Sequence, residues 1–204
     1  MAAGRFDLTI STFVETGTNK GETSVWASGV FDRVVTIEAS ELLYRAAVKQ
    51  YHGIGNIEFL FGDCRLRLVD VVASLTSPAL FWLDAHWCGN STFGKSAECP
   101  VLDELSAINS SAHGHVILID DARLFLAPPP PPHEADHWPT IANICETLDR
   151  GTAKRHISVF RDVIVAVPST FRHCVVDFLR AAAIDGPAGS LHNSRGKPAR
   201  WISV

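Results

Sequence analysis

The sequence predicts one α/β domain built on a doubly wound, mostly parallel β-sheet that ends in an antiparallel hairpin. Up to about residue 120, short apolar runs alternate with longer amphipathic ones, a rhythm typical of βαβ units. The run His115–Ile119 is almost continuously apolar, as expected for a strand covered on both faces. Two later β-rich runs are separated only by Arg161 and Asp162. Two residues are too few for a crossover helix, so these runs must form a hairpin.

Periodicity places the elements of the first part of the chain. Short runs rich in Val, Ile, Phe and Trp, most of them followed by Gly or Asp, predict five strands. These are Thr12–Glu15, Arg33–Glu38, Ile57–Phe61, Leu80–Asp84 and His115–Asp120. Amphipathic stretches between the strands predict four helices. These are Gly21–Ser28, Ser40–Tyr51, Arg65–Leu75 and Val101–Ile108.

The pattern changes after Asp121. The loop 122–139 contains five consecutive prolines, Pro128–Pro132, which predict a stiff polyproline segment. The length predicts a single domain, over residues 1–184, and we expect a tail over 185–204 that is either flexible or covers a substrate. The remaining elements are a helix, the two hairpin strands and a last helix: Thr140–Leu148, His156–Phe160, Val163–Val167 and Thr170–Ala183.

Composition excludes several classes of protein. The net charge is −4, from 18 Lys and Arg against 22 Asp and Glu, which argues against a non-specific nucleic-acid binder. No apolar run approaches the roughly 18 residues of a membrane span, and the N-terminus lacks the apolar core of a secretory signal. Five cysteines without a C-x-x-C pair favour a reducing compartment. We therefore expect a cytoplasmic protein with neither nucleic-acid nor membrane partners.

The turn after the first strand is a candidate ligand site, because open parallel sheets bind ligands at the carboxyl ends of their strands. The chain there reads Glu15-Thr16-Gly17-Thr18-Asn19-Lys20-Gly21. Its two glycines allow a sharp turn and a close approach of the backbone to a ligand. The spacing differs from G-x-G-x-x-G, so an ordinary strand-to-helix turn is the alternative interpretation.

The second and third strands also end near acidic residues. Glu38 lies about 20 positions beyond the glycine turn, where a carboxylate accepts hydrogen bonds from ribose hydroxyls. Ser40 is the better cap for the following helix, which leaves Glu38 free for a ligand. Asp63, in Gly62-Asp63-Cys64, either caps a helix or accepts a hydrogen bond from an adenine amino group.

Three carboxylates follow the fourth and fifth strands: Asp84, Asp120 and Asp121. If these strands are neighbours, the carboxylates converge and repel one another unless they are protonated or bridged by a cation. Oxygen ligands suit a hard divalent ion, so we predict a metal site at this edge. The alternative is that each Asp only ends a strand and starts a turn.

A zinc site is a second interpretation of the residues near the fourth strand. His86, Cys88 and Cys99 would need a fourth ligand such as His113 or His115, and their spacing matches no familiar zinc motif. The histidines on either side of Gly114 are instead expected to lie in a turn, exposed to solvent.

The tryptophans fall into two groups. Trp87 and Trp138 lie in loops at the ligand-binding edge and are candidates for stacking on a ring. Trp26, Trp82 and Trp201 are expected to be packing residues.

Over about residues 10–180, these motifs resemble, in order, those of the class I S-adenosylmethionine-dependent methyltransferases. The turn 14–24 is similar to the E-x-G-x-x-x-G motif of the catechol O-methyltransferase branch, and Val35–Glu38 to the motif whose Glu holds the ribose. Gly62–Cys64 resembles the adenine-side motif. Leu83-Asp84 and Asp120-Asp121 resemble the metal-binding positions of catechol- and macrocin-type enzymes. The resemblance implies a Rossmann-like fold, with the hairpin supplying its antiparallel last strand.

The same resemblance implies a cofactor, a metal and their ligands. S-adenosylmethionine would be bound by residues at the first four strand ends: Glu15, Gly17, Thr18, Gly21, Glu38, Ala39, Asp63, Cys64 and Asp84. A divalent metal would be bound by Asp84, Asp120 and Asp121. Mg²⁺ is the first expectation for this metal, with Ca²⁺ and Mn²⁺ as alternatives.

The sequence departs from the catechol branch in ways that bear on the substrate. About ten residues precede the first strand, so we expect no N-terminal helical lid. His86 lies two positions after Asp84, where some sugar O-methyltransferases carry an acidic base, so His86 is the candidate catalytic base. These features predict metal-dependent O-methylation of a small-molecule hydroxyl, on a sugar or natural product, by a chain that could form a homodimer. The alternatives are a metal-independent N- or carboxyl-methyltransferase of the same fold and a non-catalytic partner subunit.

Overall fold

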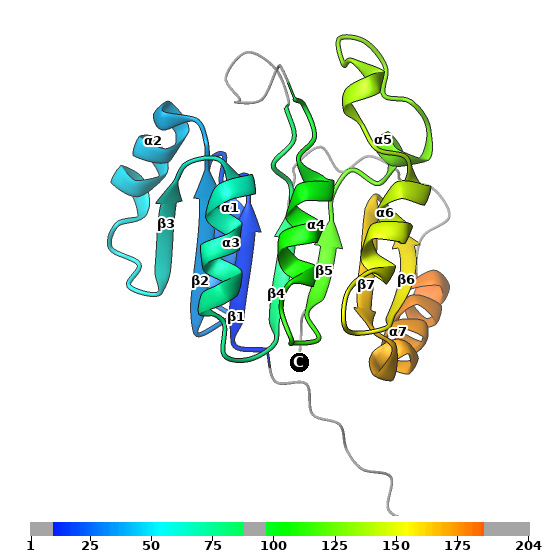
Figure 1. Cartoon of the computed structure of the whole chain (residues 1–204). Helices are drawn as coiled ribbons and strands as arrows, with labels where there is room; N and C mark the ends of the chain where they lie inside the picture. The colour runs from blue at the N-terminus through cyan, green and yellow to red at the C-terminus, as the bar shows by residue number, and fades with distance from the viewer. Residues whose placement is uncertain (1–9, 88–96, 186–204) are drawn as a thin grey trace, which may run out of the picture.

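The computed structural model of the chain describes residues 10–87 and 97–185. Its strands are β1 (Thr12–Thr16), β2 (Arg33–Glu38), β3 (Ile57–Phe61), β4 (Ala79–Leu83), β5 (Val116–Ile119), β6 (Arg155–Phe160) and β7 (Val163–Pro168). They form one sheet in the order β3-β2-β1-β4-β5-β7-β6 (Figure 1). β1 to β5 are parallel, and β7 runs antiparallel to both β5 and β6. The predicted sheet and its closing hairpin are confirmed.

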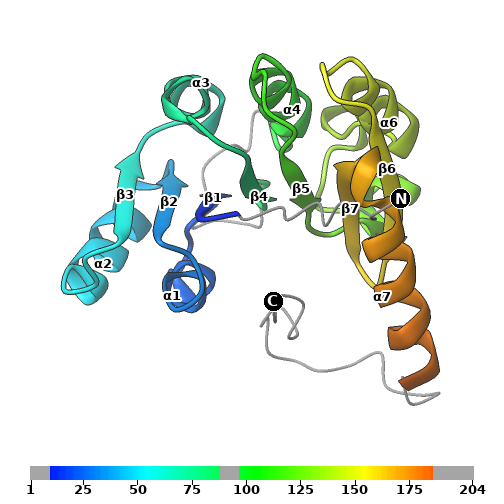
Figure 2. The same cartoon turned by 90° about the horizontal axis from the view of Figure 1, so that it is seen from below.

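Helices cover both faces of the sheet. They are α1 (Glu22–Ser28), α2 (Glu41–Tyr51), α3 (Cys64–Ser74), α4 (Val101–Asn109), α5 (Arg123–Leu126), α6 (Ile141–Asp149) and α7 (Arg172–Asp185). Seen from below, α3, α4 and α6 lie on one face, and α1, α2 and α7 lie on the other (Figure 2). None of the described helices is long and apolar enough to cross a bilayer.

The order of the strands determines where a ligand can bind. From β1 the chain passes to β2 on one side, whereas β4 and β5 extend the sheet on the other side. Helices that start from β1 and β4 therefore lie on opposite faces, and this reversal opens a crevice at the carboxyl ends of the two strands. Every residue of β1 and of β4 is buried, so the crevice rests on the buried centre of the sheet.

The segment 122–139 is more ordered than the uninterrupted loop predicted from its sequence. It contains α5, whose Phe125 is buried in the main core, and a short 3₁₀ helix at Ala135–His137. The proline run is not one continuous polyproline helix either. The chain turns at Pro131 and Pro132, where the His133 N–H donates to the carbonyl of Pro130.

The prediction that His115 lies in a turn exposed to solvent was wrong, because its side chain is fully buried. The Ala79 N–H donates to its Nδ1 at 3.0 Å, and its Nε2 lies 2.8 Å from the Ser111 hydroxyl. Burial lowers the pKa of His115 to about 4, which keeps the ring neutral near pH 7. The ring precedes β5, at the opposite end of the sheet from His86, so the two histidines do not form the zinc site considered above. Cys88 lies outside the described residues.

Candidate active site

A cleft runs along the carboxyl ends of β1 to β4. It extends from Glu38 and Asp63 on one side to Asp84 and His86 on the other, and it encloses about 730 Å³ including its open mouth. The position is the one expected for ligands of an open, mostly parallel sheet.

Backbone geometry explains both glycines of the first turn. Gly17 has a φ of 86°, and a Cβ at this position would collide with the carbonyl oxygen of Asp84. Gly21 has a φ of 76°, and its Cβ would lie 2.9 Å from the ring of Tyr51. Because only glycine adopts such angles without strain, both positions are needed for the turn to pass close to β4 and α2. Gly17 also lines the cleft, whereas Gly21 does not.

Glu15 and Thr18 support the turn from below and do not line the cleft. The Glu15 carboxylate accepts hydrogen bonds from the hydroxyls of Thr36, at 2.7 Å, and Ser24. The Thr18 hydroxyl lies 2.6 Å from that of Thr36. Burial raises the pKa of Glu15 to about 7 despite these hydrogen bonds. The two side chains therefore hold β1, β2 and the turn together.

Glu38 connects the turn to the start of α2. Its carboxylate accepts hydrogen bonds from the N–H of Asn19 and from the N–H of Ser40, both at 2.8 Å. A carboxylate has about four acceptor directions, so two remain for a ligand. Ser40 occupies the N-cap position of α2 without making a side-chain capping bond. Ala39 continues the wall of the cleft beside Glu38.

Asp63 acts as the helix cap, one of the two roles left open by the sequence. Its carboxylate accepts from the Arg65 N–H at 2.9 Å and forms an ion pair with the Arg65 guanidinium. These contacts lower the pKa of Asp63. Asp63 and Cys64 both line the cleft, but the Cys64 side chain is buried. Burial strongly raises the pKa of the Cys64 thiol, so it is not a nucleophile near neutral pH.

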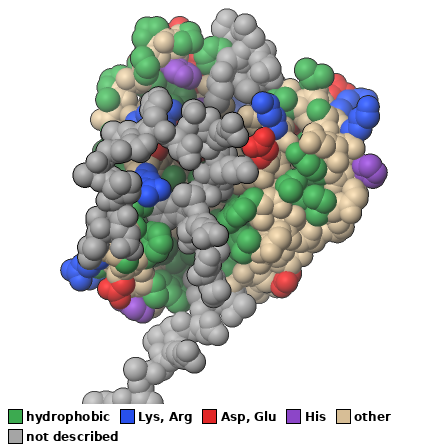
Figure 3. Space-filling model, turned by 180° about the vertical axis from the view of Figure 1, so that it is seen from behind, with side chains coloured by type: hydrophobic (Ala, Val, Ile, Leu, Met, Phe, Trp, Pro, Cys, Tyr) green, Lys and Arg blue, Asp and Glu red, His purple; other side chains and the backbone are tan. Residues whose placement is uncertain are grey.

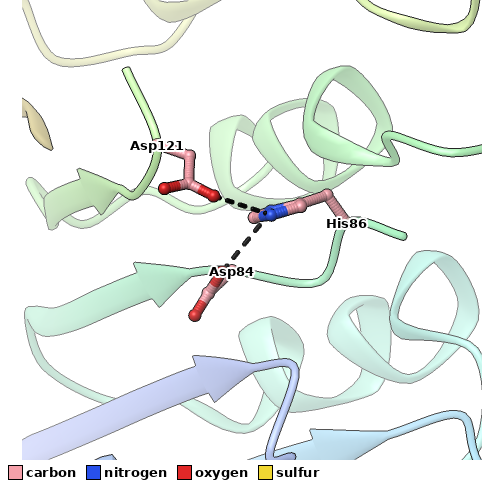
Figure 4. Close-up of side chains that lie close together, drawn as sticks. All are labelled: Asp84, His86 and Asp121. Carbon is pink, nitrogen blue, oxygen red and sulfur yellow. Dashed lines mark ion pairs between the residues drawn. The ribbon is translucent and has the colours of Figure 1, made fainter. Parts of the chain in front are cut away.

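Asp84, His86 and Asp121 converge beyond β4 and β5 (Figure 4). His86 Nδ1 lies 3.4 Å from a carboxylate oxygen of Asp84, and His86 Nε2 lies 2.9 Å from one of Asp121. One ligand atom from each residue lies within 4.8 Å of the other two, a spacing that suits a shared metal ion. Asp121 adopts a positive φ of 55°, which Asp tolerates better than most residues.

Asp120 lies next to this cluster but is not one of its three members. Its carboxylate accepts a hydrogen bond from the Asp121 N–H at 2.9 Å. The structure therefore brings together two of the three predicted metal ligands, Asp84 and Asp121, and adds His86, which the sequence had suggested as a base.

The two clustered carboxylates differ in their electrostatics. Burial, reinforced by the negative charge of Asp120, raises the pKa of Asp84 to about 8. Burial also acts to raise the pKa of Asp121, but hydrogen bonds from His86 and Arg123 outweigh it and hold the value at about 2. Without a cation, Asp84 thus favours its protonated form near pH 7 while Asp121 is ionised.

Comparisons by sequence and by structure give different results. No family model and no curated protein match the sequence. An O-methyltransferase from Bacillus cereus with S-adenosylhomocysteine is 16% identical, with a TM-score of 0.53 over 77% of this chain and 74% of that one. A methyltransferase from Podospora anserina, also bound to S-adenosylhomocysteine, is 17% identical, with a TM-score of 0.50 over 77% of this chain and 71% of that one. The chain has the class I methyltransferase fold.

Glu98 is a buried residue near the site that the sequence analysis did not select. It lies just before α4, and its buried carboxylate accepts from Trp138 Nε1 at 2.7 Å and from the Glu134 N–H at 3.2 Å. His133 Nδ1 lies 3.0 Å from the same carboxylate. The Trp138 ring in turn packs against that of His86, with the ring centres 5.4 Å apart. Glu98 therefore fixes the proline-containing loop beside the metal candidate.

Trp87 and Trp138 are almost fully buried, so they form the wall of this region and do not present open faces for stacking. Glu104 is a further buried carboxyl group, and burial raises its pKa to about 7. Its position was foreseeable, because helical spacing places it on the same face as Val101, Leu105 and Ile108, all buried.

Proposed function

We propose that this chain is an S-adenosylmethionine-dependent methyltransferase that methylates a hydroxyl group of a small molecule with the help of a divalent cation. The observation that carries this proposal is the continuity of one cleft from Glu38, suited to a ribose, to Asp84 and His86, suited to a metal. A cofactor held at one end would present its methyl group toward an acceptor held at the other. The proposed reaction moves the methyl group from the sulfonium to the acceptor oxygen, and the hydroxyl proton leaves to a base.

The cofactor end of the cleft has suitable chemistry. Glu38 keeps two acceptor directions after binding the backbone of Asn19 and Ser40, enough for two ribose hydroxyls. Leu43 and Ala39 add an apolar wall on which an adenine ring can lie. The S-adenosylhomocysteine bound by the Bacillus cereus and Podospora anserina proteins supports this choice of cofactor.

The donor set at the other end suits a divalent metal. Two carboxylates and one imidazole would bind it, and a cation would offset the burial and the charge repulsion that together raise the pKa of Asp84. Because imidazole is a better ligand for Mn²⁺ than for Ca²⁺ or Mg²⁺, we place Mn²⁺ first among the candidates. When bound, the cation would supply positive charge that lowers the pKa of an acceptor hydroxyl. Asp120 would reinforce the negative potential from outside the ligand set.

A second candidate function needs no metal. The 2.9 Å contact between His86 Nε2 and Asp121 also fits a base whose ring orientation is held by a carboxylate. In that case His86 would accept the proton itself, and the acceptor atom could be nitrogen or a carboxylate oxygen. The ring cannot serve as metal ligand and as base through the same nitrogen, so metal dependence separates the two candidates.

The acceptor and the setting are further parts of the proposal. We propose a small polar acceptor, a sugar or natural-product hydroxyl, in preference to a nucleic acid, because the cleft edge is acidic and the net charge is −4. We also propose that the protein is cytoplasmic and that it could form a homodimer. A non-catalytic partner subunit would retain the fold without binding the cofactor.

Binding measurements on the full chain test the proposal before any acceptor is known. S-adenosylhomocysteine should bind by calorimetry with micromolar affinity, and Mn²⁺ should bind independently, with a signal abolished by chelator. Failure of S-adenosylhomocysteine to bind at millimolar concentration would overturn the cofactor assignment and favour the non-catalytic subunit. Normal cofactor binding without Mn²⁺ binding would overturn the metal and leave the His86 base. Mass spectrometry of acceptor mixtures, with and without chelator, then identifies the methylated atom.

A further inference from the structure

One face of the sheet carries an apolar groove away from the proposed active site. Its floor is formed by β1, β4, β5 and β7, and its walls by α1 and α7 (Figure 2). Trp26 lies on one wall, and Val175 and Phe178 lie on the other. Among the described residues, no charged side chain lines this groove. Figure 3 views this face of the molecule and shows hydrophobic side chains among the polar ones.

The sequence of the groove floor indicates that it should be covered. Ile117 and Ile119 of β5, on the face that carries α4, are 0% and 1% exposed. Val116 and Leu118 alternate with them and are only half-buried, although they line the groove. β7 repeats the pattern with Val163 and Val165. Strands that are apolar on both faces are normally buried on both, so the groove exposes a surface built to pack against another element.

We propose that the C-terminal segment 186–204 of the same chain binds in this groove and anchors there through Trp201, Ile202 and Val204. Three of its last four residues are apolar, and Trp carries a large apolar area. The segment follows α7, which is itself a wall of the groove. Its 19 residues can extend over about 60 Å, whereas α7 rises only about 16 Å between Cys174 and Asp185.

Two other occupants are less suited to the groove. In the N-terminal segment 1–9, Asp7 separates Phe6 from Leu8, so a charge would enter the uncharged groove between the two anchors, whereas no charged residue lies between Trp201 and Val204. A second copy of the chain would present the same apolar groove. Two grooves facing one another would leave both of them unfilled. The proposal does not depend on the proposed methyltransferase activity.

Disulfide cross-linking tests the proposal, because Cys174 is an exposed free cysteine in the groove. In the full chain, Ser203→Cys should form an intramolecular disulfide with Cys174 on mild oxidation, as mapped by peptide mass spectrometry. The matched control is Ser194→Cys, which lies nine residues beyond Asp185, compared with 18 for Ser203. A free tether would bring the nearer cysteine to Cys174 at least as often. We expect Ser203→Cys to link at least ten-fold faster, and the preference to vanish in concentrated urea.

Other outcomes would overturn the proposal. Equal rates, or a faster reaction of Ser194→Cys, would show that the segment does not bind the groove. Disulfides between two chains would identify a second copy as the occupant. Adding Trp201→Ser to Ser203→Cys should reduce the rate to that of the control and increase binding of an apolar dye. An unchanged rate would exclude Trp201 as the anchor, and because this residue lies outside the described core, the variant should still fold.

Discussion

The two ends of the cleft are built in different ways. At the cofactor end, Glu38 bonds to the backbone of Ser40 and Asn19, and Asp63 bonds to Arg65 two residues on. At the metal end, His86 contacts Asp121, and Glu98 contacts Trp138, both across long separations in the sequence. The first end combines local turns and caps with the pairing of β1 and β2, whereas the second depends on contacts between segments that lie farther apart in the chain.

Because the two ends are built differently, substitutions at them should differ in how they affect ligand affinity and the stability of the fold. Changes at the cofactor end should weaken a ligand and leave the fold intact, because the side chains there lie at strand and helix ends. At the metal end, the buried carboxylate of Glu98 holds a loop, and the half-buried carboxylates of Asp84 and Asp121 are candidate metal ligands, so changes there should affect the loop, the metal or both. Variants at matched positions can therefore test whether the two ends are independent.

The largest effect is expected for Asp121→Asn. This change removes a negative ligand and its contact with His86, so Mn²⁺ affinity should fall at least about 100-fold. Asp120→Asn is the matched control, because it changes the neighbouring carboxylate outside the cluster. It should reduce Mn²⁺ affinity by less than about ten-fold. Both variants should bind S-adenosylhomocysteine as the parent does, and Mn²⁺ titration followed by electron paramagnetic resonance measures the difference. Equal losses in the two variants would return Asp120 to the ligand set.

The next effect is expected at the cofactor end. Glu38→Ala removes the charge-assisted acceptors proposed for the ribose, which should weaken S-adenosylhomocysteine binding by about 2 kcal/mol, or about 30-fold. Asp63→Asn is the control, because the Asp63 carboxylate is already engaged by Arg65, and affinity should change by less than about three-fold. Calorimetry gives both values. A large loss of affinity in Asp63→Asn with no loss in Glu38→Ala would reject the ribose assignment of Glu38. It would instead support the alternative in which Asp63 binds the adenine amino group.

A smaller effect, on stability, is expected at Glu98. Glu98→Gln replaces an acceptor of several hydrogen bonds with a neutral amide, so the free energy of unfolding should fall by about 1.5 kcal/mol. Glu134→Gln, an exposed change in the same loop, should alter it by less than about 0.5 kcal/mol. Urea unfolding monitored by circular dichroism measures both. Equal stability of the two variants would show that the Glu98 contacts do not hold the loop.

The same contrast explains how much the sequence could predict. β2, β3 and the closing hairpin were predicted within about a residue, because alternation and turn length act over neighbouring positions. Glu38 and Asp63 were found because they lie at the end of a strand or just after one. Glu98 was missed, because its partners lie 35 to 40 residues away in a proline-containing loop. His115 was misplaced for a related reason, since its acceptor role for Ala79 depends on the pairing of β4 with β5.

The last prediction concerns how stability depends on pH through two buried carboxyl groups, Glu15 beneath the turn at the cofactor end and Glu98 behind the metal end. Burial raises the pKa of Glu15 to about 7, so its proton is bound more tightly in the folded chain. Its stabilising contribution is complete below pH of about 4.5 and is lost as pH rises through about 7. Glu98 behaves in the opposite sense. Burial alone would raise its pKa, but the hydrogen bonds from Trp138, Glu134 and His133 lower it, so its contribution is present at neutral pH and is lost on acidification.

Urea unfolding between pH 3 and pH 8 should therefore separate Glu15→Gln from Glu98→Gln. In Glu15→Gln, the loss of stability between pH 4.5 and 7 should be smaller than in the parent, by at most about 1.4 kcal/mol per pH unit for one proton. In Glu98→Gln, the slope in that range should remain, and the loss below about pH 4 should become smaller. If the free energy of unfolding changed with pH in the same way in both variants, the two carboxyl groups would titrate alike. That result would contradict the proposed electrostatic difference between the two ends. Opposite changes would show that the cofactor end rests on a protonated carboxyl group and the metal end on an ionised one.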